Sequence, residues 1–118
     1  MPREAVIYHN TRCSNSCGAL TILRERGVPH QVVEYLKAPL DAAGLTALME
    51  LLESPPHDMV RVKEAAYHEA GLSGQSSPED LIEAMVAHPS LMQRPIVVQG
   101  ERATIARPPE MLKGWLRD

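Results

Sequence analysis

The sequence predicts an α/β fold built on a four-stranded mixed sheet with helices on its faces. Residues 4–36 read strand, helix, strand, and a helical crossover of this kind joins parallel strands. Near the C-terminus, two apolar runs flank the turn Gly100-Glu101, which predicts an antiparallel hairpin, and a short helix follows. A helical segment separates these two halves.

The N-terminal half is predicted to contain a strand at residues 4–9, a helix at 15–26 and a strand at 31–36. Gly27 ends the helix at the position that favours glycine, just past the last turn. The apolar side of this helix is expected to carry Ser16, Cys17, Leu20 and Leu23.

Helix signals dominate the middle of the chain. Asp41 is the expected N-cap of a helix that ends at residues 54–56, Ser-Pro-Pro. One or two short helices are predicted within residues 58–70, closed by Gly71. Residues 77–87 predict a further helix, because a serine cap precedes proline at the first helical position.

The C-terminal half is predicted to form strands at residues 95–99 and 102–106, then a helix at 108–115. The complete order is β-α-β, a helical insertion, and β-β-α, which is the layout of the thioredoxin fold in one domain spanning residues 1–118. Because the chain has no Phe and aromatic residues make up 3%, its core must use Leu, Val, Ile, Met and Ala.

Composition excludes several classes of function. Hydrophobic residues make up 44% and charged residues 23%, as in ordinary globular proteins. A net charge of -3 gives no support to a nucleic-acid or membrane-surface partner. The sequence shows no signal peptide and no apolar run long enough to span a membrane. We therefore expect a cytoplasmic protein, in which the two cysteines are reduced rather than part of a disulfide scaffold.

Cys13 lies where the first strand pattern ends and the first helix begins. Unpaired N–H groups and the positive end of the helix dipole favour an anion there, so a thiol at this position is more acidic than a free one. The same N–H groups can hold a tetrahedral oxyanion. The segment therefore predicts a nucleophile beside an anion pocket; the alternative is a small buried cysteine at a strand end.

Three motifs occur in one order along the chain. They are Tyr-His-Asn-x-x-Cys at residues 8–13, His-Pro-x-Leu-x-x-Arg-Pro-Ile-Val-Val at 88–98, and Ala-Arg-Pro-x-Glu at 106–110. Together they resemble the glutaredoxin-coupled arsenate reductase family over nearly the whole chain. The resemblance implies that Cys13 attacks arsenate and forms a thiol-arsenate adduct.

The resemblance also implies roles for other residues. Arg94 and Arg107, with Arg61 on a less distinctive motif, match the arginines that hold the oxyanion. Three guanidinium groups and a helix N-terminus would balance the charge that develops as an oxygen leaves. The supporting residues are His9, which matches a histidine thought to keep the cysteine ionised, Asn10, Ser14, and Pro95, at the cis-proline position of thioredoxin folds.

In the family's scheme, glutathione is the thiol co-substrate that displaces the adduct, and glutaredoxin restores the cysteine. No metal and no bound organic cofactor are implied. Two residues depart from the family pattern: Thr11 replaces proline, and Cys17 replaces arginine or another polar residue. Because Cys13 and Cys17 are spaced i, i+4, Cys17 is a candidate resolving thiol; alternatively it packs within the helix.

Other classes of function fit the sequence less well. A C-x5-R phosphatase loop is excluded because Ala19 occupies the arginine position. A zinc site needs about four ligands, which two cysteines and scattered histidines do not supply. A general glutaredoxin-like thiol-disulfide oxidoreductase is the nearest alternative. A redox-sensitive transcription regulator that binds RNA polymerase is a second, although the related regulators carry C-x-x-C and this chain has C-x3-C.

Overall fold

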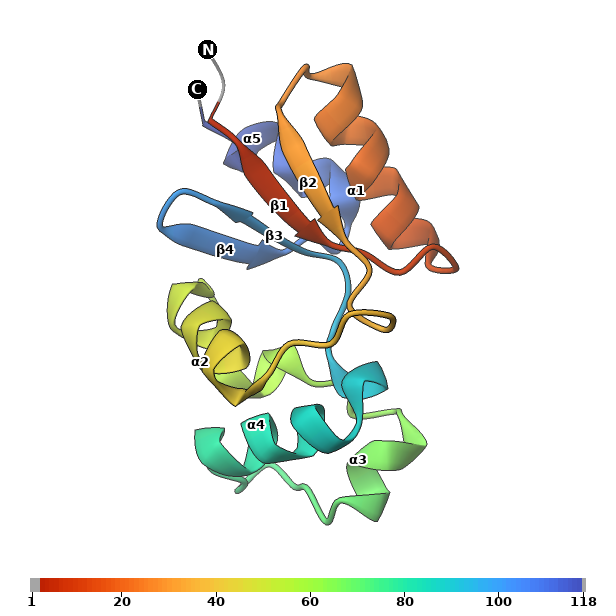
Figure 1. Ribbon diagram of the computed structural model, residues 1–118, viewed down its shortest axis with the longest axis vertical. Helices are drawn as coiled ribbons and strands as arrows, with labels where there is room; N and C mark the ends of the chain where they lie inside the picture. The colour runs from red at the N-terminus through yellow and green to blue at the C-terminus, as the bar shows by residue number, and fades with distance from the viewer. Residues whose placement is uncertain (1–2, 118) are drawn as a thin grey trace.

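A four-stranded mixed sheet with strand order β2-β1-β3-β4 forms the centre of the fold (Figure 1). The computed structural model describes residues 3–117. β1 (Ala5–Tyr8) pairs in parallel with β2 (His30–Val33) and antiparallel with β3 (Ile96–Gln99). β3 pairs antiparallel with β4 (Arg102–Ile105). The predicted parallel pair, antiparallel pair and mixed sheet are confirmed.

The two faces of the sheet support separate hydrophobic clusters. Val97 of β3 faces a cluster with α1 (Ser14–Glu25) and α5 (Leu112–Trp115). Its neighbour Ile96 faces a second cluster, which is built mainly from the helical insertion. The insertion contains α2 (Ala42–Leu51), α3 (Ala65–Glu69) and α4 (Pro78–Ala87), and short 3-10 helices cover Pro56–Met59, Pro89–Leu91 and, before α5, Pro109–Met111.

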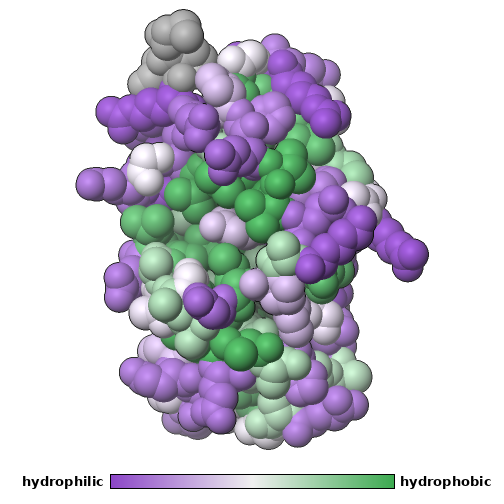
Figure 2. All heavy atoms as spheres, viewed as in Figure 1, coloured by the Kyte–Doolittle hydropathy of each residue, from purple (hydrophilic) through white to green (hydrophobic). Residues whose placement is uncertain are grey.

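In Figure 1 the insertion forms a separate layer below the sheet, while α1 and α5 lie together on the other side of it. Figure 2 shows hydrophobic surface gathered at the level of the sheet and its junction with the insertion, with hydrophilic residues toward both ends. The sheet with α1 and α5 therefore meets the helical insertion along one boundary, which we call the seam. The segments that cross this seam position the candidate site.

Local signals in the sequence explain where the helices begin. The Asp41 carboxylate accepts the Gly44 N–H at 2.8 Å, which confirms the predicted cap of α2. Ser77 and Asp80 form a reciprocal capping box at the start of α4. Gly27 has a φ of +65° just past α1, a conformation that glycine adopts without strain.

Two expectations about local structure need correction, and one about the middle of the chain is confirmed. The second strand ends at Val33 and not at residue 36, because the chain turns and buries Tyr35 in the insertion's cluster. The one or two short helices expected within residues 58–70 are confirmed as the end of the 3-10 helix Pro56–Met59 and α3, with Gly71 following α3. Cys17 is exposed and does not lie on the apolar side of α1, since it is turned about 100° from Ser16. The buried residues of α1 are Ser16, Ala19, Leu20, Ile22 and Leu23.

Candidate active site

Cys13 is the N-cap residue of α1, and its side chain is 9% exposed. Its backbone N–H donates to the Asn10 carbonyl at 3.1 Å, which closes the loop between β1 and the helix. Burial raises the pKa of the Cys13 thiol and is the largest single influence on it. Hydrogen bonds from the Ser16 N–H, the Arg94 side chain and the Asn15 N–H outweigh it, so the net pKa is lowered. This position therefore favours the thiolate.

A hydrogen-bonded triad organises the loop beneath the thiol. The Ser16 hydroxyl is fully buried; it lies 2.6 Å from His9 Nδ1 and accepts the Asn10 N–H at 3.0 Å. Burial lowers the pKa of His9 most, Glu34 opposes this shift, and Arg24 adds to it. The imidazole is thus neutral at neutral pH. His9 therefore contacts the side chain of Ser16, and the backbone N–H of Ser16 is one of the groups that lower the pKa of Cys13.

Arg94 and Arg107 lie together at the end of the sheet. Arg94 lies two residues before β3, and the Arg94–Pro95 peptide bond is cis, as the family resemblance implies. A guanidinium nitrogen of Arg107 donates to the Arg94 carbonyl at 2.9 Å. Within residues 3–117, the buried Nε of Arg94 has no hydrogen-bond partner. A buried donor without a partner is costly, so an incoming anion would find an unused N–H here.

Close packing of α1 against the last segment keeps Arg107 near the thiol loop. Gly18 of α1 faces Pro109, and a Cβ built on Gly18 would lie 3.1 Å from the Pro109 Cγ. A larger residue would push the segment after Arg107 away from the helix. The Arg107–Pro108 peptide bond is also cis, which the sequence did not predict.

Arg61 approaches the site from the insertion. Its backbone N–H donates to the Leu91 carbonyl at 2.8 Å, and its guanidinium pairs with Glu64 at 2.6 Å. Its charge acts on Tyr35, as does that of Arg94. Arg61 and Arg94 therefore border the same region, but Arg61 has a carboxylate partner that sequence reasoning missed.

Tyr35 is a second residue that the sequence analysis missed. Tyr8 and Val33 are register partners on parallel strands, and Asn10 and Tyr35 each follow two residues later. Burial raises the pKa of Tyr35 most and Cys13 raises it further, whereas Arg94, the Asn10 side chain and Arg61 lower it, so these groups border one region. The signal was present in the sequence, since carboxyl ends of adjacent parallel strands meet at one edge.

The other predicted site residues are Ser14, Pro95 and Cys17, and within residues 3–117 none of them has a side-chain hydrogen bond to Cys13. Ser14 is exposed at the first position of α1, and Pro95 is buried at the cis bond. Cys17 directs its thiol toward the Thr11 carbonyl, at 3.4 Å, while Cys13 is buried. Both cysteines are free. The structure thus shows the two thiols in different surroundings, although the Cys17 N–H donates to the Cys13 carbonyl at 2.9 Å.

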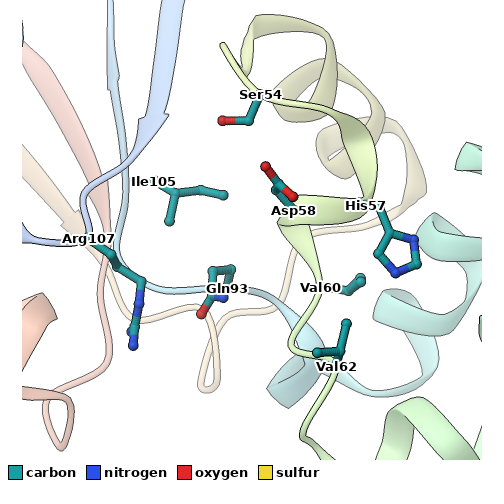
Figure 3. A pocket seen from close by; sticks show the side chains of 8 residues that line it. All are labelled: Ser54, His57, Asp58, Val60, Val62, Gln93, Ile105 and Arg107. Carbon is teal, nitrogen blue, oxygen red and sulfur yellow. The ribbon is translucent and has the colours of Figure 1, made fainter. Parts of the chain in front are cut away.

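A groove of about 470 Å³ separates the sheet from the insertion beside Arg107 (Figure 3). Gln93, Ile105 and Arg107 line its sheet side, and Ser54, Asp58 and Val62 are among the residues on the insertion side. Because Gln93 adjoins Arg94 in sequence, the groove begins next to the candidate site. Within residues 3–117, no three or more His, Cys, Asp or Glu side chains are grouped so as to bind a metal ion.

Comparisons with known proteins agree with this arrangement. Residues 8–114 match the ArsC family. The chain is 39% identical to an arsenate reductase of Neisseria meningitidis over 96% of this chain and 98% of that protein. It is 46% identical to the uncharacterized protein YfgD of Escherichia coli, over 95% and 96% of the two chains.

A solved structure, an arsenate reductase from Vibrio cholerae, superposes with a TM-score of 0.88 at 37% identity. This superposition covers 97% of the present chain and 98% of the other. The fold is therefore thioredoxin-like, as predicted. No helix within residues 3–117 combines the length and apolar character that crossing a membrane requires. By the match over residues 8–114 and the identity to full-length relatives, the chain belongs to the ArsC family.

Proposed function

We propose that the protein reduces arsenate, or a similar oxyanion, to arsenite with Cys13 as the nucleophile. One observation carries the proposal: Cys13 is the N-cap of α1, where the Ser16 and Asn15 N–H groups and the Arg94 side chain lower the pKa of its thiol despite its burial. Arg107, bonded to the Arg94 carbonyl, brings a second guanidinium to the same place. Relatives that cover nearly the whole chain carry the name arsenate reductase.

The first step forms a bond between the Cys13 sulfur and arsenic. The thiolate attacks dihydrogen arsenate, an As–O bond breaks, and the departing oxygen leaves as water after gaining a proton. Arsenic remains pentavalent in this thiol-arsenate adduct. The arginines and the amides at the start of α1 bind the remaining oxygens and balance their charge.

The second step uses glutathione as the reductant. Its sulfur attacks the Cys13 sulfur and the S–As bond breaks, leaving its electron pair on arsenic. Arsenite and a mixed disulfide of Cys13 with glutathione are the products. Glutaredoxin then returns the Cys13 thiol, so the cycle needs no bound metal or organic cofactor. A glutathione pool of this kind places the reaction in the cytoplasm.

Cys17 is the observation that favours a second candidate function, thiol-disulfide oxidoreduction. It is exposed and free, and it lies one helical turn from Cys13. A disulfide between them would require the first turn of α1 to open, because the Cys17 N–H is bonded to the Cys13 carbonyl. Such a bond would be easily reduced, which suits a catalytic or regulatory disulfide.

A coupled assay separates the two functions. Glutathione and glutathione reductase are supplied, and NADPH oxidation is followed either with arsenate and added glutaredoxin or with a small organic disulfide and no glutaredoxin. We expect turnover of arsenate, its loss in Cys13→Ser, and its retention in Cys17→Ser. Turnover of the disulfide alone would refute the arsenate proposal. Loss of arsenate turnover in Cys17→Ser would place Cys17 in the cycle.

A further inference from the structure

The groove between the sheet and the insertion leads to the candidate site along its sheet-side wall. Ile105 ends β4 and pairs with Ile96, so the chain after β4 runs beside the chain before β3. The Arg107 guanidinium donates to the Arg94 carbonyl at 2.9 Å. Ile105 and Arg107 both line the groove. One end of the groove therefore lies beside Arg94.

Strand register brings the Cys13 loop to the same end of the sheet. Tyr8 ends β1 and pairs with Ile96, which begins β3. The loop that carries Cys13 therefore starts beside the segment that carries Arg94. A ligand that extends from the groove past Arg107 enters the region of the nucleophile.

Backbone hydrogen bonds fix the junction between the two walls of the groove. The Gln93 N–H donates to the Met59 carbonyl at 2.8 Å, and the Arg61 N–H donates to the Leu91 carbonyl at 2.8 Å. These bonds tie two chain segments together on either side of Val60, which lines the groove with Gln93. The groove is thus built from the backbone and is present before a ligand binds.

The groove carries opposite charges at its two ends. Figure 3 shows the Asp58 carboxylate and the Arg107 guanidinium at different ends, with the Gln93 amide between them in this view. Within residues 3–117, the Asp58 carboxylate forms no ion pair. Arg107 has further N–H groups besides the one that bonds the Arg94 carbonyl. A ligand with an ammonium group at one end, peptide groups in the middle and a negative group at the other end complements this lining.

We propose that this groove binds glutathione, the reductant of the second step. The inference rests on the proposed function, in which a glutathione sulfur attacks Cys13. The γ-glutamyl ammonium pairs with Asp58, the Gln93 side chain bonds a peptide group, and the cysteinyl thiol lies at the Arg107 end. The volume of about 470 Å³ falls in the range of about 300–1,000 Å³ that is usual for small-molecule sites.

Bound in this orientation, glutathione completes the second step with atoms and electrons in balance. Its thiol loses a proton to solvent, and its sulfur forms a bond to the Cys13 sulfur. The S–As bond breaks and leaves its electron pair on arsenic, which passes from pentavalent to trivalent as the two sulfurs are oxidised to a disulfide. The released arsenite takes up protons from solvent. Arg107, where the groove meets Arg94, favours the thiolate form of a thiol beside it.

A second hollow, of about 370 Å³, lies against the loop between β1 and α1 and provides a matched control. Arg12, Glu34 and Lys37 are among its lining residues, and none of Arg61, Arg94 and Arg107 is. Its carboxylate already has a partner, because Glu34 lies 3.5 Å from Lys37 Nζ. The groove with the unpaired carboxylate is therefore the better site for an ammonium group.

The test follows attack of glutathione on Cys13 without arsenate. In a Cys17→Ser background, Cys13 is converted to a mixed disulfide with thionitrobenzoate, and the released chromophore reports attack by added glutathione. We expect the rate to saturate with glutathione. Asp58→Asn should raise the half-saturating concentration about tenfold, because a hydrogen bond between charged groups is lost. Glu34→Gln should leave it unchanged, and attack by 2-mercaptoethanol should be equal in all three proteins.

An analogue that lacks the ammonium group, glutaryl-cysteinyl-glycine, isolates the contact with Asp58. It should half-saturate the parent protein at about tenfold higher concentration, with no further change in Asp58→Asn. The inference is overturned if Asp58→Asn leaves glutathione unaffected, if it weakens glutathione and the analogue equally, or if Glu34→Gln has the larger effect. Arsenate turnover is measured separately. Its absence beside Asp58-dependent saturation refutes the proposed function and supports the groove, whereas its presence with unsaturable attack refutes the groove alone.

Discussion

Replacing Ser16 by alanine should destabilise the fold without changing the acidity of Cys13. The fully buried Ser16 hydroxyl contacts His9 Nδ1 at 2.6 Å and accepts the Asn10 N–H at 3.0 Å. A buried polar group left without a partner costs about 1–3 kcal/mol, and Ser16→Ala leaves two. Because Asn10 is only half-buried, we expect a loss of about 2–4 kcal/mol, or roughly 8–16 °C in Tm.

Urea and thermal unfolding followed by circular dichroism would measure this loss. Ser14→Ala is the matched control, since Ser14 is exposed at the start of the same helix, and its effect should stay within about 0.5 kcal/mol. The contact between residue 16 and the Cys13 sulfur is made by a backbone N–H, which alanine keeps. A Ser16→Ala protein as stable as the control, or one with an ordinary Cys13 pKa, would refute the reasoning.

Three further predictions follow from the site. Iodoacetamide alkylation of Cys13 should reach half-maximal rate below the ordinary thiol pKa of about 8.5, and a midpoint at or above that value contradicts the assignment. Arg94→Ala should abolish calorimetric oxyanion binding. Arg102→Ala should leave anion binding intact but cost about 2 kcal/mol of stability, because Arg102 stacks on Trp115 at 4.3 Å and bonds its carbonyl at 2.9 Å. Equal anion affinities of Arg94→Ala and Arg102→Ala would refute the assignment of Arg94 to the site. The pKa of His9 is lowered on folding, so the unfolded chain takes up a proton first as pH falls; unfolding free energy should decrease below about pH 6.5, and His9→Asn should flatten that decrease.

The parts of the fold that depend on local interactions were predictable from sequence. Asp41 and Ser77 cap their helices through bonds three residues away, so short sequence patterns identify them. The pairing of strands followed from connection lengths and turn chemistry. The position of Cys13 at the start of α1 followed from the same local reasoning.

What the sequence did not predict depends on packing between distant segments. Residues 31–36 are rich in strand-forming side chains, but Tyr35 leaves the sheet because the insertion buries its ring. Cys17 sits one position beyond the buried stripe of α1, and the expected boundary of that stripe was off by one residue. The ion pair between Arg61 and Glu64 forms in the turn before α3, whose exact start the sequence did not predict.

The two hydrophobic clusters hold different residues of the site in place, one on each side of the sheet. Cys13 and Ser16 are held by α1 and the cluster on its face of the sheet, whereas Tyr35 belongs to the insertion's cluster. If the insertion opened locally while the sheet stayed folded, the N–H groups that acidify the sulfur would remain and the tyrosine would be lost. The chain would then keep the thiol with Arg94 and Arg107 but lose the contributions of Tyr35 and Arg61, which approach from the insertion. Local opening of the insertion would therefore change the surroundings of the thiol without removing the residues that lower its pKa.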